Sequence, residues 1–176
     1  RNALKYMIYA NGNATVIPLD SGSRIGEYVS LALDTNNKAH LAYVDTVNKV
    51  LKYAKCTGDN PFSTDNWVKD NVDTDLNGMS NSTLALDKDN LPHIAYQSGA
   101  GSAKKLKYIK RNSDRNWSQP QEIDTGFIDS ENYNSCIAIN RAGKPCIASG
   151  PNKYAEWTGT IWSTSTFTTL AIPKKS

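Results

Sequence analysis

Short runs of alternating large and small apolar residues recur along this chain at a constant interval. Leu31–Asp34 returns as Leu84–Asp87 and again as Ile137–Asn140, each displaced by 53 positions. A second run keeps the same register, at His40–Tyr43, His93–Tyr96 and Cys146–Ser149. A fixed period near 50 residues, built from short apolar runs, is typical of stacked β units.

Each repeat contains four strand-like segments, joined by connections rich in Asn, Asp, Gly, Ser and Pro, and none shows a helical period. The expected strands are Ser30–Asp34, His40–Asp45, Leu51–Cys56 and Trp67–Asp73 in the first repeat, Thr83–Asp87, His93–Ser98, Leu106–Lys110 and Trp117–Asp124 in the second, and Cys136–Asn140, Cys146–Ser149, Lys153–Trp157 and Ile161–Thr168 in the third. Four short strands per unit of this length predict the blade of a β-propeller.

The faces of these strands support the same architecture. Leu31 and Leu33 would lie on one face, and the alternate positions are small rather than charged. A sheet with one solvated face would carry charged or polar residues there, whereas a blade between two neighbours needs two dry faces. We therefore expect six repeat positions to be buried between blades: Leu33, Leu41, Leu86, Ile94, Ile139 and Ile147.

The chain enters the repeat at a third strand, because Leu4–Tyr6 matches Leu51–Tyr53 and Leu106–Tyr108. We predict an all-β fold, a β-propeller segment of about three and a half four-stranded antiparallel blades with about fourteen strands. The predicted divisions are a half blade at 1–20, blades at 21–73, 74–124 and 125–170, and a tail at 171–176.

The half blade lacks its first two strands, and an unpaired strand edge recruits partners. We therefore expect either self-association, as a homodimer in which two copies of three and a half blades make seven, or a missing propeller half. The start at Arg1-Asn2-Ala3, without Met or a signal-peptide core, indicates a processed, truncated or engineered chain.

The bulk composition argues against two classes of partner, nucleic acid and membrane. The 176 residues carry a formal net charge of +3, so no strong electrostatic footprint for nucleic acid is present. No run of 18 apolar residues is found, so no membrane span is predicted. We expect neither nucleic acid nor membrane as a partner.

The three cysteines, Cys56, Cys136 and Cys146, form no C-x-x-C pair. A disulfide between Cys136 and Cys146 on neighbouring strands is one alternative. Their positions, which other repeats fill with Thr83 and His93, favour buried free thiols.

Two features resemble metal ligands in composition only. Asp34–Asn37 and Asp87–Asn90 contain oxygen ligands, but their spacing favours an Asx-capped hairpin turn over a calcium loop. His40 and His93 occupy equivalent positions in adjacent blades, too far apart to share one ion, which favours structural hydrogen bonding. We expect no metal and no cofactor.

Aromatic residues provide the candidate ligand contacts. One tryptophan opens each fourth strand and is interpreted as packing between blades: Trp67, Trp117 and Trp162. By contrast, Tyr28, Tyr133 and Trp157 do not repeat in register. Tyr28 and Tyr133 fall in connections between blades, which cluster on one face of a propeller and commonly hold its ligands. Tyr28, Tyr133 and Trp157 are therefore the predicted ligand-binding residues.

The succession Leu-Ala-Leu-Asp…His-Leu-Ala-Tyr…Leu-Lys-Tyr-Ala…Trp, read from Leu31 to Trp67, resembles the blade repeats of bacterial and archaeal sialidase-like propeller proteins. The strings Ser63–Trp67 and Ser113–Trp117 are too short, and lack the glycine, for an intact Asp-box. Because many such proteins are secreted or surface-exposed, the resemblance favours an extracellular or cell-surface location.

The predicted function is a non-catalytic propeller module for binding or scaffolding, with carbohydrate as the ligand class. No catalytic residue is assigned, since the arginines have no convincing partners for a sialidase centre and no Ser-His-Asp or phosphate-loop motif is present. Two alternatives stay open: a fragment of a sialidase-like glycoside hydrolase, or a truncated or engineered half-propeller without a ligand.

Overall fold

The computed structural model describes residues 3–74, 76–100, 103–112, 116–124, 134–150 and 152–167. These residues form fourteen strands in four antiparallel sheets, one of two strands and three of four. They also include the 3₁₀ turn η1 (Thr64–Asn66). None of the described helical structure is long or apolar enough to cross a membrane. The predicted all-β segment of three and a half blades is confirmed.

The sheets follow the order of the chain. The half blade pairs β1 (Ala3–Ala10) with β2 (Asn13–Ser21). The first blade is β3 (Ile25–Leu33), β4 (Ala39–Asp45), β5 (Val50–Cys56) and β6 (Trp67–Asp73); the second is β7 (Met79–Leu86), β8 (Pro92–Ser98), β9 (Lys105–Lys110) and β10 (Gln121–Asp124); the third is β11 (Ser135–Ile139), β12 (Pro145–Ser149), β13 (Lys153–Trp157) and β14 (Trp162–Thr166).

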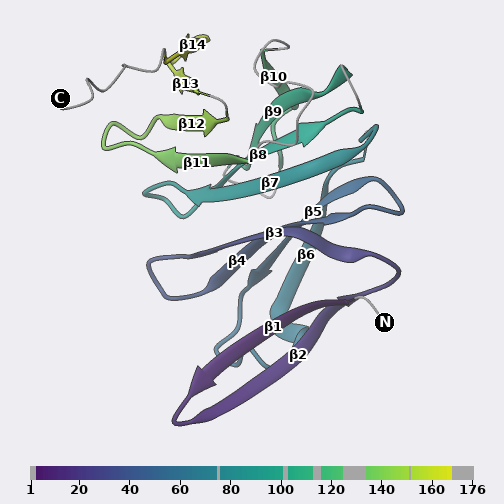
Figure 1. Ribbon diagram of the computed structural model, residues 1–176. Coiled ribbons are helices and arrows are strands. Elements are labelled where there is room, and N and C mark those ends of the chain that lie inside the picture. Colours follow the sequence, from purple (N-terminus) through teal and green to yellow (C-terminus); the bar gives the residue numbers. More distant parts are fainter. Residues whose placement is uncertain are drawn as a thin grey trace, which may run out of the picture.

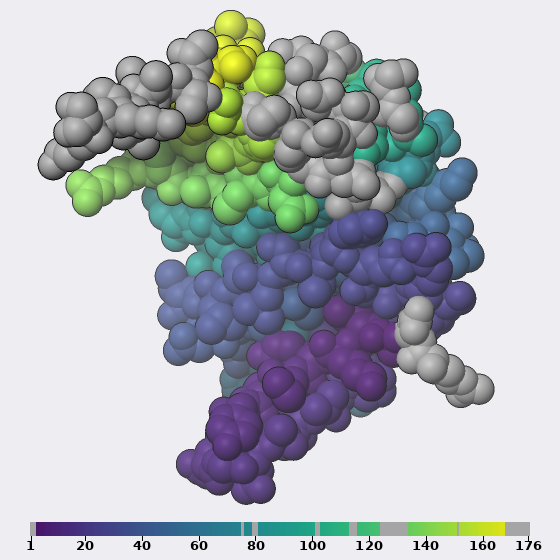
Figure 2. All heavy atoms as spheres, in the orientation of Figure 1, coloured from purple at the N-terminus to yellow at the C-terminus, as the bar shows by residue number. Residues whose placement is uncertain are grey.

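The blades stack one on another from the half blade at one end to the third blade at the other (Figure 1). The space-filling view shows the same succession of layers, with β1 and β2 projecting below the first blade (Figure 2). Within a blade each strand pairs with its sequence neighbour. Short turns join the first two strands of each blade, whereas longer connections, 57–66 and 111–120, join β5 to β6 and β9 to β10.

Large side chains of one blade pack on small ones of the blade before it. Between the first and second blades, Leu84 and Ile94 share a core cluster with Ala42. Between the second and third, Ile137 and Ile147 pack with Ala95. The predicted dry, two-sided blades are present at both of these interfaces.

The six residues predicted to lie between blades divide into three groups. Leu41, Ile94 and Ile147 are buried, as predicted. Leu86 and Ile139 are only half-buried, because they lie at the ends of their strands. The prediction for Leu33 was wrong: its side chain is 54% exposed. Among the described residues, the half blade has no inner strands to cover this part of β3.

Hydrogen bonds also join neighbouring blades at repeated positions. The backbone N–H of Leu84 donates to Ser30 Oγ at 3.0 Å, and that of Ile137 donates to Thr83 Oγ1 at 3.4 Å. A strand-two tyrosine reaches the aspartate that ends the preceding blade. The two bonds are Tyr43 Oη to Asp20 Oδ2 at 2.9 Å and Tyr96 Oη to Asp73 Oδ2 at 2.5 Å.

The two histidines have structural partners. His40 Nδ1 lies 2.6 Å from Tyr53 Oη, and its Nε2 lies 3.4 Å from Asp34 Oδ2. Burial lowers the pKa of His40 to about 4, with Lys55 adding to the effect. The Asp34 carboxylate also accepts backbone N–H bonds within its own turn, which confirms the Asx-turn interpretation. The described residues contain no group of three His, Cys, Asp or Glu side chains placed to hold a metal.

All three cysteines are free thiols. Cys136 pairs with Ala148 across the β11–β12 ladder, and Cys146 pairs with Ala138, so the two thiols are not opposite one another. The expected burial holds for Cys56 and is wrong for Cys136, which is exposed; Cys146 is intermediate. Cys136 faces away from the second blade, and no described blade follows to cover it.

Candidate ligand-binding cleft

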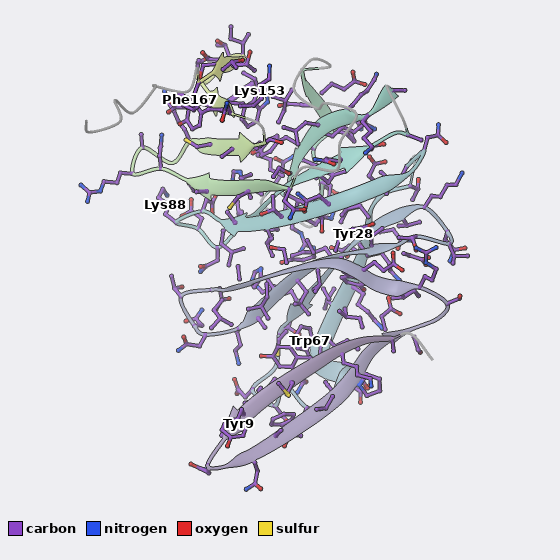
Figure 3. All side chains as sticks on the ribbon, in the orientation of Figure 1. Tyr9, Tyr28, Trp67, Lys88, Lys153 and Phe167 are labelled. Carbon is purple, nitrogen blue, oxygen red and sulfur yellow. The ribbon has the colours of Figure 1, made fainter. Side chains whose placement is uncertain are left out.

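One cleft contains a residue that the sequence singled out. It encloses about 200 Å³ beside the first blade, near the β4–β5 turn and the connection from β6 to β7. Its lining is Arg24, Tyr28, Val44, Thr46, Lys49, Leu76 and Gly78. We call it the Tyr28 cleft. Figure 3 shows Tyr28 at the level where the first and second blades meet.

The sequence predicted Tyr28 in a connection between blades, and this was wrong: Tyr28 lies within β3, because that strand begins at Ile25. This part of β3 is irregular. The ladder between β3 and β4 shifts register between Glu27 and Ser30, and Tyr28 has a φ of +52°. Its carbonyl accepts a hydrogen bond from Ser82 Oγ of the second blade at 2.5 Å, while its side chain is 42% exposed. A register irregularity of this kind re-aims a side chain out of the regular alternation.

Left-handed backbone is concentrated around this cleft. Seven described residues other than glycine have positive φ, and four of them are asparagines, which tolerate it. The remaining three are Arg24 at +56°, Tyr28 at +52° and Lys49 at +58°, and all three line the Tyr28 cleft. Each such residue costs about 1–3 kcal/mol, and such residues cluster at functional sites.

The cleft combines charge with an apolar floor. Arg24 donates two bonds to Glu27, with Nε to Oε1 at 2.8 Å and Nη2 to Oε2 at 3.2 Å. These bonds from Arg24 lower the pKa of Glu27, which stays ionised at neutral pH. Lys49 is exposed, whereas Val44 and Leu76 are buried beneath. The arrangement offers cations and an aromatic ring above an apolar base.

Gly78 lines the cleft and lies close to Gly99, in the connection from β8 to β9. Its φ is +90°, and a Cβ on it would lie 2.9 Å from the carbonyl oxygen of Gly99. A larger residue would therefore clash with the backbone and push the rim outward. This glycine keeps the cleft narrow.

The other two predicted ligand residues are not part of this cleft. Trp157 lies on β13, half-buried, with its ring centroid 5.7 Å from that of Trp162. The second blade separates β13 from β3, so the structure does not bring Trp157 and Tyr28 together. Tyr133 lies outside the described residues.

The three repeated tryptophans pack between blades as predicted. Trp67 and Trp162 open β6 and β14, whereas Trp117 precedes β10 and forms an isolated bridge with Arg111. Each lies against the third-strand tyrosine of the preceding blade with a steep angle between the rings, the arrangement that aromatic pairs prefer. The pairs are Tyr6–Trp67 at 4.9 Å, Tyr53–Trp117 at 5.2 Å and Tyr108–Trp162 at 4.9 Å.

A second cleft of about 230 Å³ lies between the first and second blades and includes Arg111. The guanidinium pairs with Asp70 at 3.0 Å and lies over the rings of Tyr53 and Trp117, at 5.5 and 5.7 Å from their centroids. These contacts compensate the positive charge of Arg111. Because Asp70 and Tyr53 belong to the first blade, Arg111 connects the second blade to the first. The Tyr28 cleft is the better ligand site because its cations are more exposed.

Arg24 and Lys49 were missed by sequence reasoning. Arg24 follows the turn residues Gly22 and Ser23, and Lys49 ends the β4–β5 turn. Positive φ is expected for Gly or Asn, and an Arg or Lys carries no signal for it. The one available signal was that each residue flanks a turn, and the sequence did not place Lys49 near Tyr28.

Comparison with known proteins identifies the fold. No protein-family model matches the chain, and no curated protein matches it. Among solved structures, it is similar to a fucose lectin from Kordia zhangzhouensis in complex with methyl-fucoside, with 16% identity, a TM-score of 0.52, and coverage of 80% of this chain and 99% of that one. It is also similar to AofleA from Arthrobotrys oligospora, with 12% identity and a TM-score of 0.58.

The second match covers 94% of this chain, which spans half (50%) of the AofleA chain. At these identities the similarity defines a fold class rather than an activity. Together with the four antiparallel sheets, it shows a propeller-like all-β fold.

Proposed function

We propose that this chain is a non-catalytic carbohydrate-binding module and that the Tyr28 cleft holds the sugar. The proposal rests on one observation. The exposed ring of Tyr28 shares a cleft with Arg24 and Lys49, and the backbone of all three residues is left-handed. An aromatic face beside fixed polar groups matches the apolar face and hydroxyls of a pyranose.

The likeness to a fucose lectin supports this ligand class. In this proposal the Tyr28 ring stacks on the sugar, and Arg24 and Lys49 donate hydrogen bonds to its oxygens. Glu27 holds Arg24 in place and accepts no proton at neutral pH. Trp157 is proposed as a separate ligand contact on the third blade, because it lies on a different sheet from Tyr28. Tyr133 stays a proposed ligand residue.

The test is binding of a panel of methyl glycosides, including methyl-fucoside, measured by titration calorimetry on the full chain. We expect Tyr28→Asn to abolish binding while leaving the fold intact, since Asn tolerates a positive φ. Tyr28→Phe should keep most of the affinity. Tyr9→Ala is the matched control, because Tyr9 is an exposed tyrosine (71%) outside the cleft.

Two results would contradict the proposal. Unchanged binding by Tyr28→Asn would place the sugar elsewhere, and no binding to any glycoside would remove the ligand class. Release of free sugar from an aryl sialoside would instead favour the sialidase-like hydrolase.

We also propose that residues 1–20, 21–73, 74–124 and 125–170 act as the half blade and blades of one arc. Its uncovered end would be closed in the assembled protein, by self-association or by the other part of a propeller. The exposed Leu31 and Leu33 support this proposal.

A further inference from the structure

One side of β3 is open. Alternate residues Val29, Leu31 and Leu33 are 52%, 52% and 54% exposed, although the strand belongs to a four-stranded blade. Beside them, β1 pairs with β2 on one edge, and no other described strand pairs with its second edge. We call this free edge of β1, together with Val29, Leu31 and Leu33, the open slot. β3 approaches β1 at its own start, where Gly26 lies over Leu4.

The repeat shows what covers the equivalent positions. Leu84, the counterpart of Leu31, is 7% exposed because it packs with Ala32 and Ala42 of the blade before it. Ile137, the next counterpart, is 5% exposed and packs with Ala85 and Ala95. In both cases the cover is the small-residue face of a hairpin formed by strands one and two.

A polar contact marks the same hairpin. The N–H of Leu84 donates to Ser30, and that of Ile137 donates to Thr83, so the covering strand carries a hydroxyl at a fixed position. Leu31 is the preceding member of this series. Among the described residues no earlier strand one supplies it with a hydroxyl.

Tyr6 supplies an independent indication. In the first two blades the third-strand tyrosine bonds a strand-two histidine, at 2.6 Å in Tyr53–His40 and in Tyr108–His93. Tyr6 is the third-strand tyrosine of the half blade, and the chain has only two histidines, both already paired. The third blade has Cys146 at this position, so two of the three described blades carry the histidine. We expect the missing hairpin to follow these two and to place a histidine against Tyr6.

A second copy of the chain could supply such a hairpin only by taking it from one of its own blades. The three described strand-one and strand-two hairpins are β3–β4, β7–β8 and β11–β12, and each already forms the inner half of its own blade. Donating one would open an equal slot in the donor. The apolar area exposed on the donor would equal the apolar area buried on the acceptor.

We propose that the open slot is a strand-addition site for one β-hairpin of this repeat type, carried by polypeptide outside residues 1–176. The hairpin pairs with the free edge of β1 by main-chain hydrogen bonds, as in β-augmentation. Its small-residue face covers Leu31 and Leu33, its Ser or Thr accepts the Leu31 N–H, and its His bonds Tyr6. This inference is independent of the proposed sugar site.

The chain's own repeat provides the probe. A fluorescent synthetic peptide with the sequence of residues 79–98 contains Thr83, Ala85, His93 and Ala95 in the required register. Titrated with the full chain and followed by anisotropy, it should bind saturably with one peptide per chain. Leu31→Lys should weaken binding at least tenfold, and circular dichroism should show an intact fold because Leu31 is exposed. Ile161→Lys, at another exposed apolar residue (65%), is the matched control and should bind normally.

A double-mutant cycle tests the histidine contact. Tyr6→Phe should lower affinity for the native peptide several-fold, and the same change should have no effect on a peptide carrying His93→Ala. Peptide carrying Ala95→Lys should not bind. Equal affinity of the Leu31→Lys chain and the native chain would overturn the proposal. So would sedimentation of the chain alone as a stable dimer that excludes the peptide, which would assign the slot to a second copy.

Discussion

Leu31 and Leu84 occupy the same position in successive blades, within the same Leu-Ala-Leu-Asp run, yet one is 52% exposed and the other 7%. The difference lies in the neighbouring sheet. β7 faces the complete first blade, whereas β3 faces a half blade that has only outer strands. The same residue type thus contributes differently to stability at these two positions, because a side chain is buried only where a neighbouring sheet covers it.

The other end of the arc shows the same effect with a different residue. Thr83 is 9% exposed and accepts a backbone N–H from the third blade, whereas its counterpart Cys136 is exposed. The second blade is therefore the one complete blade with a complete neighbour on both sides among the described residues. It should be the most stable part of the molecule.

The largest expected effect contrasts the two leucines directly. Leu84→Ala should lower the free energy of unfolding by about 2–5 kcal/mol, the range for a buried leucine. Leu31→Ala should cost under about 1 kcal/mol, because water already reaches its side chain. Urea denaturation of both variants measures the difference. Equal losses would show that the slot is covered in solution.

A smaller contrast concerns the tyrosine–aspartate bonds between blades. Tyr96→Phe should cost about 1.5–3 kcal/mol, the value for a hydrogen bond to a charged group. Tyr43→Phe should cost less, because the Asp20 side chain is more exposed than that of Asp73 (14% against 7%) and its ion pair with Lys52, at 2.5 Å, is shorter than the 3.6 Å pair of Asp73 with Lys107. Thermal or urea unfolding of the two variants would decide the order, and a larger loss for Tyr43→Phe would reverse it.

The buried histidines predict a pH dependence. The folded-state pKa of His40 is about 4, below the unfolded value of about 6.5. As the pH falls below about 6.5 the unfolded chain gains a proton that the native state does not, so stability decreases toward pH 4. His40 should contribute a loss of about 1.4 kcal/mol between pH 7.5 and 5.5. His40→Gln should remove this part of the slope, and an unchanged slope would contradict the assignment.

The smallest effect is expected at the third blade, where Ser149 replaces the strand-two tyrosine. Its hydroxyl is buried and has no hydrogen-bond partner among the described residues. Ser149→Ala removes an unsatisfied polar group, so it should leave stability unchanged or raise it by up to about 1 kcal/mol. A clear loss in urea denaturation would reveal a partner for this hydroxyl.

Much of the fold was predictable from the repeat itself. The alternation in Leu31–Leu33 and the turn residues after Asp34 specify strands and hairpins locally, because side-chain alternation and turn geometry depend on neighbours in the chain. The partial sheet at the start followed from the match between Tyr6 and Tyr53. The packing of each fourth-strand tryptophan followed from its recurrence.

The candidate site was predictable only in part. Tyr28 was identifiable because it breaks the repeat, but Arg24 and Lys49 were not, since a positive φ in these residues is imposed by the surrounding backbone. The solvent exposure of Leu33 and Cys136 also depended on which surface lies beside them. Sequence by itself determined the blade, through local periodicity and repetition; tertiary structure alone decided which faces are buried and which residues meet in a cleft, because both depend on contacts between distant segments.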